Sequence, residues 1–366
     1  MKIGVLVCDL SSGGAERVAS LWIKGFCELG HTVSVILNSN NPILFNIPDN
    51  VERYNMCINS NGYFLKYLFY PFRIIKLRRI VKRIQPDVII AVLHPMGLYA
   101  KIATLGMKCK IINTEHNAFE RPNDMPLNKI SRFNKFYTNR LFDSVTVLTY
   151  VDRKLAENKL KRVVVMPNPL SFPAIDGQCK NNRQKQIIAV GRIDAWRIKG
   201  FDIIIKTWNE LCPEYPDWSL LIAGKGKKEN IDYLKSLGPN CIQSNQLRFE
   251  GFVEDMPGLY RTSEIFILSS RHEGFGMALL EAMSQGCACI TSDYKGRQRE
   301  IVGESECAII LDDDSIIELK TALSRVINDP ELRDRLRINA IQRSNDFSLN
   351  KIMNQWDELI HSVVNK

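Results

Sequence analysis

The chain has 366 residues, of which 45% are hydrophobic and 24% charged, and its formal net charge is +9. This length predicts two domains, and the composition is that of a globular protein rather than of a disordered one. The ten cysteines are scattered without a CxxC pair, which excludes a zinc-binding pattern and favours reduced thiols.

Positive charge is concentrated in the first half of the chain. Residues 1–170 contain 24 Lys and Arg against 12 Asp and Glu, whereas the remainder contains 25 against 28. A basic half attracts an anionic surface or an anionic substrate. The two halves are therefore expected to meet different partners.

Strands that alternate with helices are predicted throughout the first half. Apolar runs predict strands at residues 2–8, 33–37, 87–93, 110–113, 145–148 and 163–166. Their alternation with helices predicts a parallel doubly wound sheet. The first run is too short for a signal peptide, and the longest apolar stretch, 88–107, is interrupted by His94, Pro95 and Lys101.

A glycine pair follows the first predicted strand. Gly13 and Gly14 lead into a helix, and the unpaired N–H groups and the dipole at a helix start favour an anion. The turn lacks the GxGxxG spacing, so a dinucleotide-binding site is not indicated.

The segment 63–84 contains basic residues interleaved with aromatic and aliphatic ones, and it contains no acid. Its basic residues are Lys66, Arg73, Lys76, Arg78, Arg79, Lys82 and Arg83. This composition fits a segment that lies in the interface of an anionic membrane. The alternative is a helix with its apolar side on the sheet and its basic side in water. No nucleic-acid recognition motif accompanies the patch, so no nucleic-acid partner is expected.

Closely spaced prolines mark an interdomain linker. Pro167, Pro169 and Pro173 cannot continue a strand or a helix. We expect a first domain of residues 1–168, completed by a last amphipathic helix within 349–366, and a second domain of residues 169–348. In the second domain, strands are expected at residues 186–190, 220–223, 247–251, 265–268 and 288–292.

Residues 270–290 carry the strongest signal of a site. An apolar strand is followed by a glycine-rich turn at 271–276 and by a helix start, which together favour an anion. Two carboxylates, Glu273 and Glu281, bracket this turn and are good acceptors for vicinal hydroxyls. These features together suit a ligand that has a phosphate in its middle and hydroxyl groups at both ends, and a nucleotide-sugar is such a ligand. The alternative is an ordinary α/β crossover with two surface glutamates.

Two cations, Arg192 and Lys199, flank the loop after the strand at 186–190. They are well placed for a diphosphate, although they could instead be solvated loop charges. After the strand at 247–251, the backbone of Phe252 and Val253 could meet the edge of a base. The acids at 312–314 resemble a metal-binding DxD pattern but are expected to cap the helix that follows.

Together these motifs resemble the GT-B glycosyltransferases of family 4, the retaining glycosyl group-1 transferases. The resemblance covers nearly the whole chain and rests on GGAER (13–17), EHN (115–117), PNP (167–169), GRxDxxxxKG (191–200), FEGFVED (249–255), EGFGMxLLE (273–281) and the helix after FS (347–348). The chain departs from the family at 295–300, where relatives often have GGPxE, and at Lys225, where many relatives have an acid.

The resemblance implies two facing Rossmann-like domains, with the donor on the C-terminal domain and the acceptor on the N-terminal one. It implies that Arg192 and Lys199 bind the donor diphosphate as leaving group, so that neither a metal nor another cofactor is expected. Glu281 would bind the ribose diol and Glu273 the sugar hydroxyls. His116 would lie near the transferred sugar, unless it is a satisfied loop histidine. The other implied donor-binding residues are Gly13, Gly14, Gly191, Gly224, Phe252, Val253, Gly274, Phe275, Gly276 and Met277.

The expected function is therefore metal-independent transfer, with retention, of a hexose or N-acetylhexosamine from a nucleotide-sugar. UDP is preferred over GDP, and the expected acceptor is a glycan or a polyprenyl-diphosphate-linked oligosaccharide in surface polysaccharide assembly. We expect a cytoplasmic protein that is peripheral on the inner face of the plasma membrane. One alternative is a nucleotide-sugar 2-epimerase, which needs no acceptor. Another is a non-catalytic nucleotide-sugar-binding partner, which shows no turnover.

Overall fold

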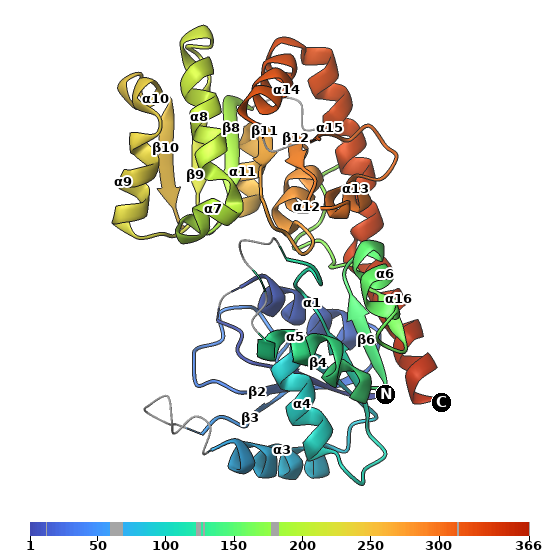
Figure 1. Ribbon diagram of the computed structural model, residues 1–366. Coiled ribbons are helices and arrows are strands. Elements are labelled where there is room, and N and C mark those ends of the chain that lie inside the picture. Colours follow the sequence, from blue (N-terminus) through green and yellow to red (C-terminus); the bar gives the residue numbers. More distant parts are fainter. Residues whose placement is uncertain are drawn as a thin grey trace. The chain divides into compact units, whose positions relative to one another are not determined.

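The computed structural model describes residues 1–11, 13–58, 69–121, 126, 129–176, 183–312 and 315–365. The chain forms two compact units, each built on its own parallel sheet (Figure 1). Unit 1 comprises Met1–Ser171 and Leu349–Lys366, and unit 2 comprises Phe172–Ser348. The assignment of one unit to the acceptor and the other to the donor stays a prediction.

In the described part of unit 1, the sheet has seven strands in the order β3-β2-β1-β4-β5-β6-β7. The strands are β1 (Lys2–Val7), β2 (Thr32–Leu37), β3 (Glu52–Asn55), β4 (Val88–Val92), β5 (Lys110–Thr114), β6 (Ser144–Val147) and β7 (Val163–Val165). Strand β1 pairs in parallel with both β2 and β4. The strand order reverses between β1 and β4, and such switch points hold the ligand in open α/β sheets.

The helices of unit 1 cover its sheet. They are α1 (Gly14–Glu28), α3 (Tyr70–Ile84), α4 (His94–Ala103), α5 (Lys129–Phe136), the 3₁₀ turn η1 (Thr138–Leu141), α6 (Tyr150–Glu157) and the terminal α16 (Leu349–Val364). Leu77 of α3 and Ala100 of α4 share one buried cluster with Leu6 and Ile89 of the sheet. Helix α16 packs on α1 through the rings of Trp356 and Trp22, whose centroids are 4.8 Å apart.

In the described part of unit 2, the sheet has six strands in the order β10-β9-β8-β11-β12-β13. The strands are β8 (Gln184–Val190), β9 (Ser219–Ala223), β10 (Leu247–Gly251), β11 (Ser263–Leu268), β12 (Ala288–Ser292) and β13 (Ala308–Leu311). Strand β8 pairs in parallel with β9 and β11. The switch point of this unit therefore lies between β8 and β11.

Helices and short turns connect the strands of unit 2. They are η2 (Ile193–Ala195), α7 (Trp196–Lys199), α8 (Phe201–Leu211), η3 (Cys212–Glu214), α9 (Lys228–Ser236), α10 (Pro239–Gln243), α11 (Met256–Thr262), α12 (Met277–Ser284), α13 (Arg297–Val302), α14 (Ile316–Asn328), α15 (Pro330–Ser344) and η4 (Asn345–Phe347). Trp208 of α8 and Leu323 of α14 are buried in one cluster with Ile222 and Ile267 of the sheet.

The predicted α/β class with two doubly wound parallel sheets is confirmed. The prediction that Asp312 caps α14 is wrong. The N-terminal cap of α14 is Ser315, whose hydroxyl accepts a hydrogen bond from the Glu318 N–H at 3.1 Å. Asp312 instead pairs with Arg299 at 2.9 Å, and residues 313 and 314 lie outside the described residues. None of the described helices combines the length and the apolar character that crossing a membrane requires.

Candidate active site

The carboxyl ends of β8 and β11 form the core of the candidate site. Because these strands are parallel neighbours, the residues that follow them emerge at one edge of the sheet. Gly191 and Arg192 follow β8, and the turn from Ser269 to Gly276 follows β11. Arg192 is exposed, and Gly191 lies against the methylene stem of Lys199. Unit 2 thus brings together the predicted cations and the glycine-rich turn.

Lys199 and Glu273 form an ion pair at this edge. The Lys199 Nζ atom lies 2.5 Å from Glu273 Oε1, and the two side chains are 24% and 13% exposed. The Ser270 hydroxyl donates to the same oxygen at 2.9 Å. The cation predicted to bind the diphosphate and the carboxylate predicted to bind the sugar are therefore adjacent.

Contacts between the loops after β8 and β11 hold this pair in place. Gly200 has φ +67°, and a Cβ there would lie 2.0 Å from the Ser269 carbonyl oxygen, so only glycine fits. The Ser269 hydroxyl donates to the carbonyl oxygens of Lys199 and Gly200 at 3.2 and 3.0 Å. The Arg271 guanidinium binds both carboxylate oxygens of Asp202 at 2.8 and 2.9 Å. The loops after β8 and β11 are thereby held to each other by protein contacts.

The ends of β9 and β10 extend the site along the same edge. Gly224 follows β9, and its N–H donates to the Gly251 carbonyl oxygen at 2.6 Å. Phe252 is 64% exposed, and the Lys225 ammonium lies 4.4 Å from the centre of its ring. Val253 is half-buried. Lys225, where an acid was expected from the resemblance, therefore places a cation on the ring of Phe252, one of the two predicted base contacts.

The glycine-rich turn ends at the start of α12. Gly276 is the N-terminal cap with φ +101°, and Met277 is the first helical residue. The Phe275 side chain is buried against the ring of Phe347, with centroids 5.8 Å apart. Phe275 can therefore contact the donor only through its backbone. The predicted donor contact of Gly274 is likewise a backbone contact.

Glu281 lies on α12 and is 7% exposed. The Tyr260 hydroxyl on α11 donates to Glu281 Oε2 at 3.3 Å. This bond orients a largely buried carboxylate, which is the arrangement that a fixed acceptor for hydroxyl groups requires. The ribose contact itself stays a prediction.

In unit 1, Gly13 caps α1 with φ +113° and Gly14 is its first residue. A Cβ on Gly13 would collide with the Glu16 carboxylate, whereas one on Gly14 would meet open space. The helix start is therefore already next to a carboxylate of its own helix. A phosphate at this position would have to displace Glu16.

His116 follows β5 and is half-buried. Its Nε2 atom lies 3.1 Å from the Thr114 hydroxyl, and its ring centroid lies 5.4 Å from that of Trp22. Burial lowers the pKa of His116 to about 4, so the imidazole is neutral near pH 7. A neutral ring can exchange a hydrogen bond with a sugar hydroxyl, which is the predicted role.

His94 was missed as a candidate by sequence reasoning. It follows β4, beside β1 at the switch point of unit 1, and its Nε2 atom contacts the Thr138 hydroxyl. Leu93 before it has φ +69°, which is a strained conformation for leucine. Burial lowers the pKa of His94 to about 4 as well. Unit 1 thus carries two neutral imidazoles at the carboxyl ends of neighbouring strands.

These histidines predict that acid destabilises unit 1. Their pKa values rise from about 4 in the folded chain to about 6.5 on unfolding, so between these pH values the unfolded chain binds more protons. The free energy of unfolding should fall as the pH is lowered through this window, by about 3 kcal/mol at most for each histidine. Urea denaturation at about pH 7 and about pH 5 measures the loss.

The variant His116→Gln should lose less stability over the same pH range, because it has one imidazole fewer to protonate. The variant His361→Gln, which removes an exposed imidazole, serves as the matched control. An equal loss in His116→Gln and wild type would contradict the assignment.

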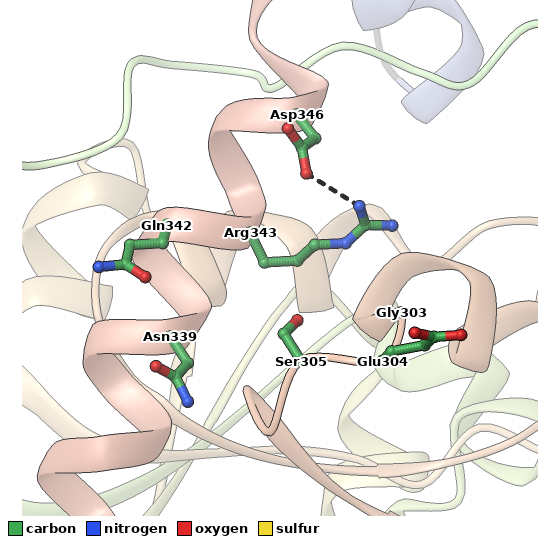
Figure 2. A pocket seen from close by; sticks show the side chains of 7 residues that line it. All are labelled: Gly303, Glu304, Ser305, Asn339, Gln342, Arg343 and Asp346. Atoms are coloured by element: carbon green, nitrogen blue, oxygen red, sulfur yellow. Dashed lines mark hydrogen bonds and ion pairs between the residues drawn. The ribbon is translucent and has the colours of Figure 1, made fainter.

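A separate hollow of about 440 Å³ lies between α15 and the segment that joins α13 to β13 (Figure 2). Its lining residues are Gly303, Glu304, Ser305, Asn339, Gln342, Arg343 and Asp346. Arg343 pairs with Asp346 at 2.9 Å and donates to the carbonyl oxygens of Ile301 and Glu300 at 2.8 Å each. Because its guanidinium is engaged with the protein, we assign no ligand to this hollow.

Comparisons with known proteins identify the family. The model of the family "Glycosyl transferases group 1" matches residues 174–343, and that of "Glycosyltransferase Family 4" matches residues 12–171. The chain belongs to the family 4, or group 1, glycosyltransferases. It is therefore a transferase, and the resemblance inferred from the motifs is confirmed.

Several relatives and solved structures align with this glycosyltransferase over nearly their whole length. An uncharacterized glycosyltransferase of Haemophilus influenzae is 28% identical over 98% of this chain and 99% of its own. An α-1,4-N-acetyl-D-galactosaminyltransferase of Campylobacter jejuni, named for an undecaprenol-linked glycan, is 27% identical over 100% of this chain and 99% of its own. Anabaena Alr3699/HepE in complex with UDP and glucose superposes with a TM-score of 0.76 at 20% identity, covering 99% of this chain and 100% of its own.

Proposed function

We propose that this glycosyltransferase moves a hexose or an N-acetylhexosamine from a UDP-sugar to a glycan or polyprenyl-diphosphate-linked acceptor, with retention and without a metal. The observation that carries the proposal is the ion pair of Lys199 and Glu273 in the loops after β8 and β11, with the exposed Arg192 following β8. Two cations and one carboxylate at a switch point suit a diphosphate joined to a polyhydroxylated sugar.

The cations supply what the reaction needs at the leaving group. The bond between the sugar C1 and the diphosphate oxygen breaks, and negative charge develops on that oxygen. Lys199 and Arg192 stabilise this charge, so a divalent cation is not required. The acceptor hydroxyl attacks C1 on the face that the diphosphate leaves, and its proton passes to a departing phosphate oxygen. Glu273 accepts hydrogen bonds from the sugar hydroxyls and orients the ring.

The names of relatives support the acceptor class. Two Campylobacter jejuni relatives, 27% and 26% identical, are named as N-acetylgalactosaminyltransferases that act on undecaprenol-diphosphate-linked glycans. Such acceptors are held at a membrane by their lipid. With the same acceptor class, this transferase would act at the inner face of the plasma membrane.

Helix α3 supplies a surface suited to that membrane. Phe72 and Ile75 are 55% and 48% exposed, and Arg79 and Lys82 lie further along the same side of the helix. Apolar and basic side chains on one helix side suit the interface of an anionic bilayer. We propose that α3 attaches the transferase peripherally.

Not all the basic residues predicted for this patch are equally available. Arg78 donates to the carbonyl oxygens of Ala103 and Leu105 at 2.8 Å each, so it fastens α3 to the end of α4. Arg73 donates to Ile58 and Lys76 donates to Cys57, in both cases to carbonyl oxygens. Lys66 lies outside the described residues. The exposed cations Arg79, Lys82 and Arg83 therefore carry the proposed membrane contact.

The function is tested by incubating the protein with UDP-sugars and short lipid-linked acceptors in EDTA. We expect a glycosylated product whose new linkage has the anomeric configuration of the donor, as read by NMR. Activity that disappears in EDTA and returns with Mn²⁺ would reject the metal-free mechanism. An inverted anomer would reject retention, and conversion of the donor without an acceptor would favour a 2-epimerase.

The triple variant Arg79→Gln, Lys82→Gln, Arg83→Gln is expected to lose binding to vesicles that contain about one third anionic lipid. Each cation near an anionic surface contributes about 1 kcal/mol, so the partition constant should fall at least tenfold. Vesicle sedimentation measures the loss. The control is Lys206→Gln, Lys228→Gln, Lys235→Gln, which removes equal charge from exposed positions of unit 2. Equal binding by both triple variants would reject α3 as the attachment surface.

A further inference from the structure

The Glu273 carboxylate is held through one of its two oxygens. Ser270 Oγ donates to Oε1 at 2.9 Å, and Lys199 Nζ contacts the same atom at 2.5 Å. Within the described parts of the chain, no hydrogen bond or ion pair reaches Oε2. The carboxylate is therefore oriented by the protein and retains one oxygen for a further donor.

Ser270 is itself rigidly placed. The residue is 2% exposed, and its carbonyl oxygen accepts a hydrogen bond from the Ser292 hydroxyl at 3.0 Å. Ser292 ends β12, the strand beside β11. Because water has little access to Ser270, its bond to the carboxylate is stronger than one at an exposed position.

Lys199 and Ser270, which both bind Oε1 of Glu273, differ in the number of hydrogen-bond donors that they can share with a ligand. The Lys199 ammonium is the proposed ligand of the donor diphosphate, and it has three N–H groups to share between the phosphate and Glu273. The Ser270 hydroxyl has a single proton, which is committed to Glu273. A diphosphate that drew the lysine toward itself would leave Ser270 as the partner of Oε1 among the described residues.

We propose that Ser270 is a positioning residue that fixes Glu273 so that Oε2 accepts a hydrogen bond from a hydroxyl of the donor sugar. Ser270 touches neither the sugar nor the diphosphate, and it acts only through the carboxylate. The inference rests on the proposed function, because it assumes that Glu273 binds the sugar part of a nucleotide-sugar. It predicts that the Ser270 hydroxyl matters for the sugar but not for the nucleotide.

Calorimetric titration with UDP and with UDP-glucose, UDP-galactose and their N-acetylhexosamine counterparts tests this separation. In Ser270→Ala, affinity for UDP should stay within about twofold of wild type. Affinity for the tightest UDP-sugar should fall about tenfold, the effect of one hydrogen bond to a charged group. Ser270→Thr keeps a hydroxyl and should recover most of the loss. The control Ser344→Ala removes a fully buried hydroxyl from α15 and should change neither affinity.

A double-mutant cycle shows whether Ser270 acts through Glu273. In a Glu273→Ala background, Ser270→Ala should cause no further loss of UDP-sugar affinity. Independent, additive losses would overturn the inference, as would equal losses for UDP and UDP-sugar, which indicate a merely structural role. If Ser270→Ala binds the UDP-sugar as tightly as wild type does, the inference is overturned but the proposed function is not. A wild-type protein that binds none of these probes overturns the proposed function, and the inference with it.

Discussion

Replacing Lys199 with methionine is expected to lower kcat by about 10²- to 10³-fold, the usual effect of removing one donor from a developing oxyanion. The ammonium lies at the switch point of unit 2, beside the carboxylate proposed to hold the sugar. Methionine keeps the length of the side chain and removes only its charge and its donors. Steady-state kinetics at saturating donor measure the effect, with Lys206→Met on the exposed side of α8 as control.

The same substitution has a second consequence, which must be separated from catalysis. It leaves the 13% exposed Glu273 carboxylate without its cation, and an unpaired, largely buried charge destabilises the folded state. The double variant Lys199→Met, Glu273→Gln should recover the melting temperature but not the activity. A single variant with kcat within about threefold of wild type would contradict the leaving-group role. Recovery of activity in the double variant would mean that the loss had been one of stability.

The central strands were predictable because buried parallel strands are continuous apolar runs. Residues 265–268 and 288–292 were predicted as strands, and they lie in the central strands β11 and β12. The edge strand β3 was missed because its four residues, Glu52–Asn55, are exposed or half-buried and include two charged side chains. At one edge of the unit 2 sheet, β13 is equally short and mostly half-buried. Short edge strands depend on pairing with a neighbour, which sequence periodicity does not reveal.

The members of the site were predictable one by one, but their contacts were not. Lys199 and Glu273 are separated by 74 positions, and their meeting depends on the left-handed turn at Gly200. Ser270 carries no signal in the sequence, because a serine before a glycine-rich turn is ordinary. In the sequence, His94 is recognisable only as an interruption of an apolar run. Its placement beside β1 follows from the strand order, which is a property of the whole unit.

The substitution Gly224→Ala is expected to destabilise unit 2 by about 3 kcal/mol or more, because strain and a backbone collision add. Gly224 has φ +152°, and a Cβ there would lie 1.8 Å from the Gly191 carbonyl oxygen. Neither backbone segment can move away easily, because the Gly191 N–H donates to the Ala223 carbonyl oxygen and the Gly224 N–H donates to the Gly251 carbonyl oxygen. Urea denaturation measures the change in the free energy of unfolding.

Gly251→Ala is the matched comparison. Gly251 also has a positive φ, +73°, but a Cβ there would meet nothing within 4 Å. This variant therefore experiences the conformational strain alone, about 1 kcal/mol. The difference between the two variants isolates the close approach of the loops after β8 and β9. If both variants lose the same stability, the loop at 191 yields freely, and Arg192 beside it is not held in place for the donor before the donor binds. If Gly224→Ala loses far more, the strand ends form a rigid frame, and the cations of the site are placed by the fold rather than by the ligand.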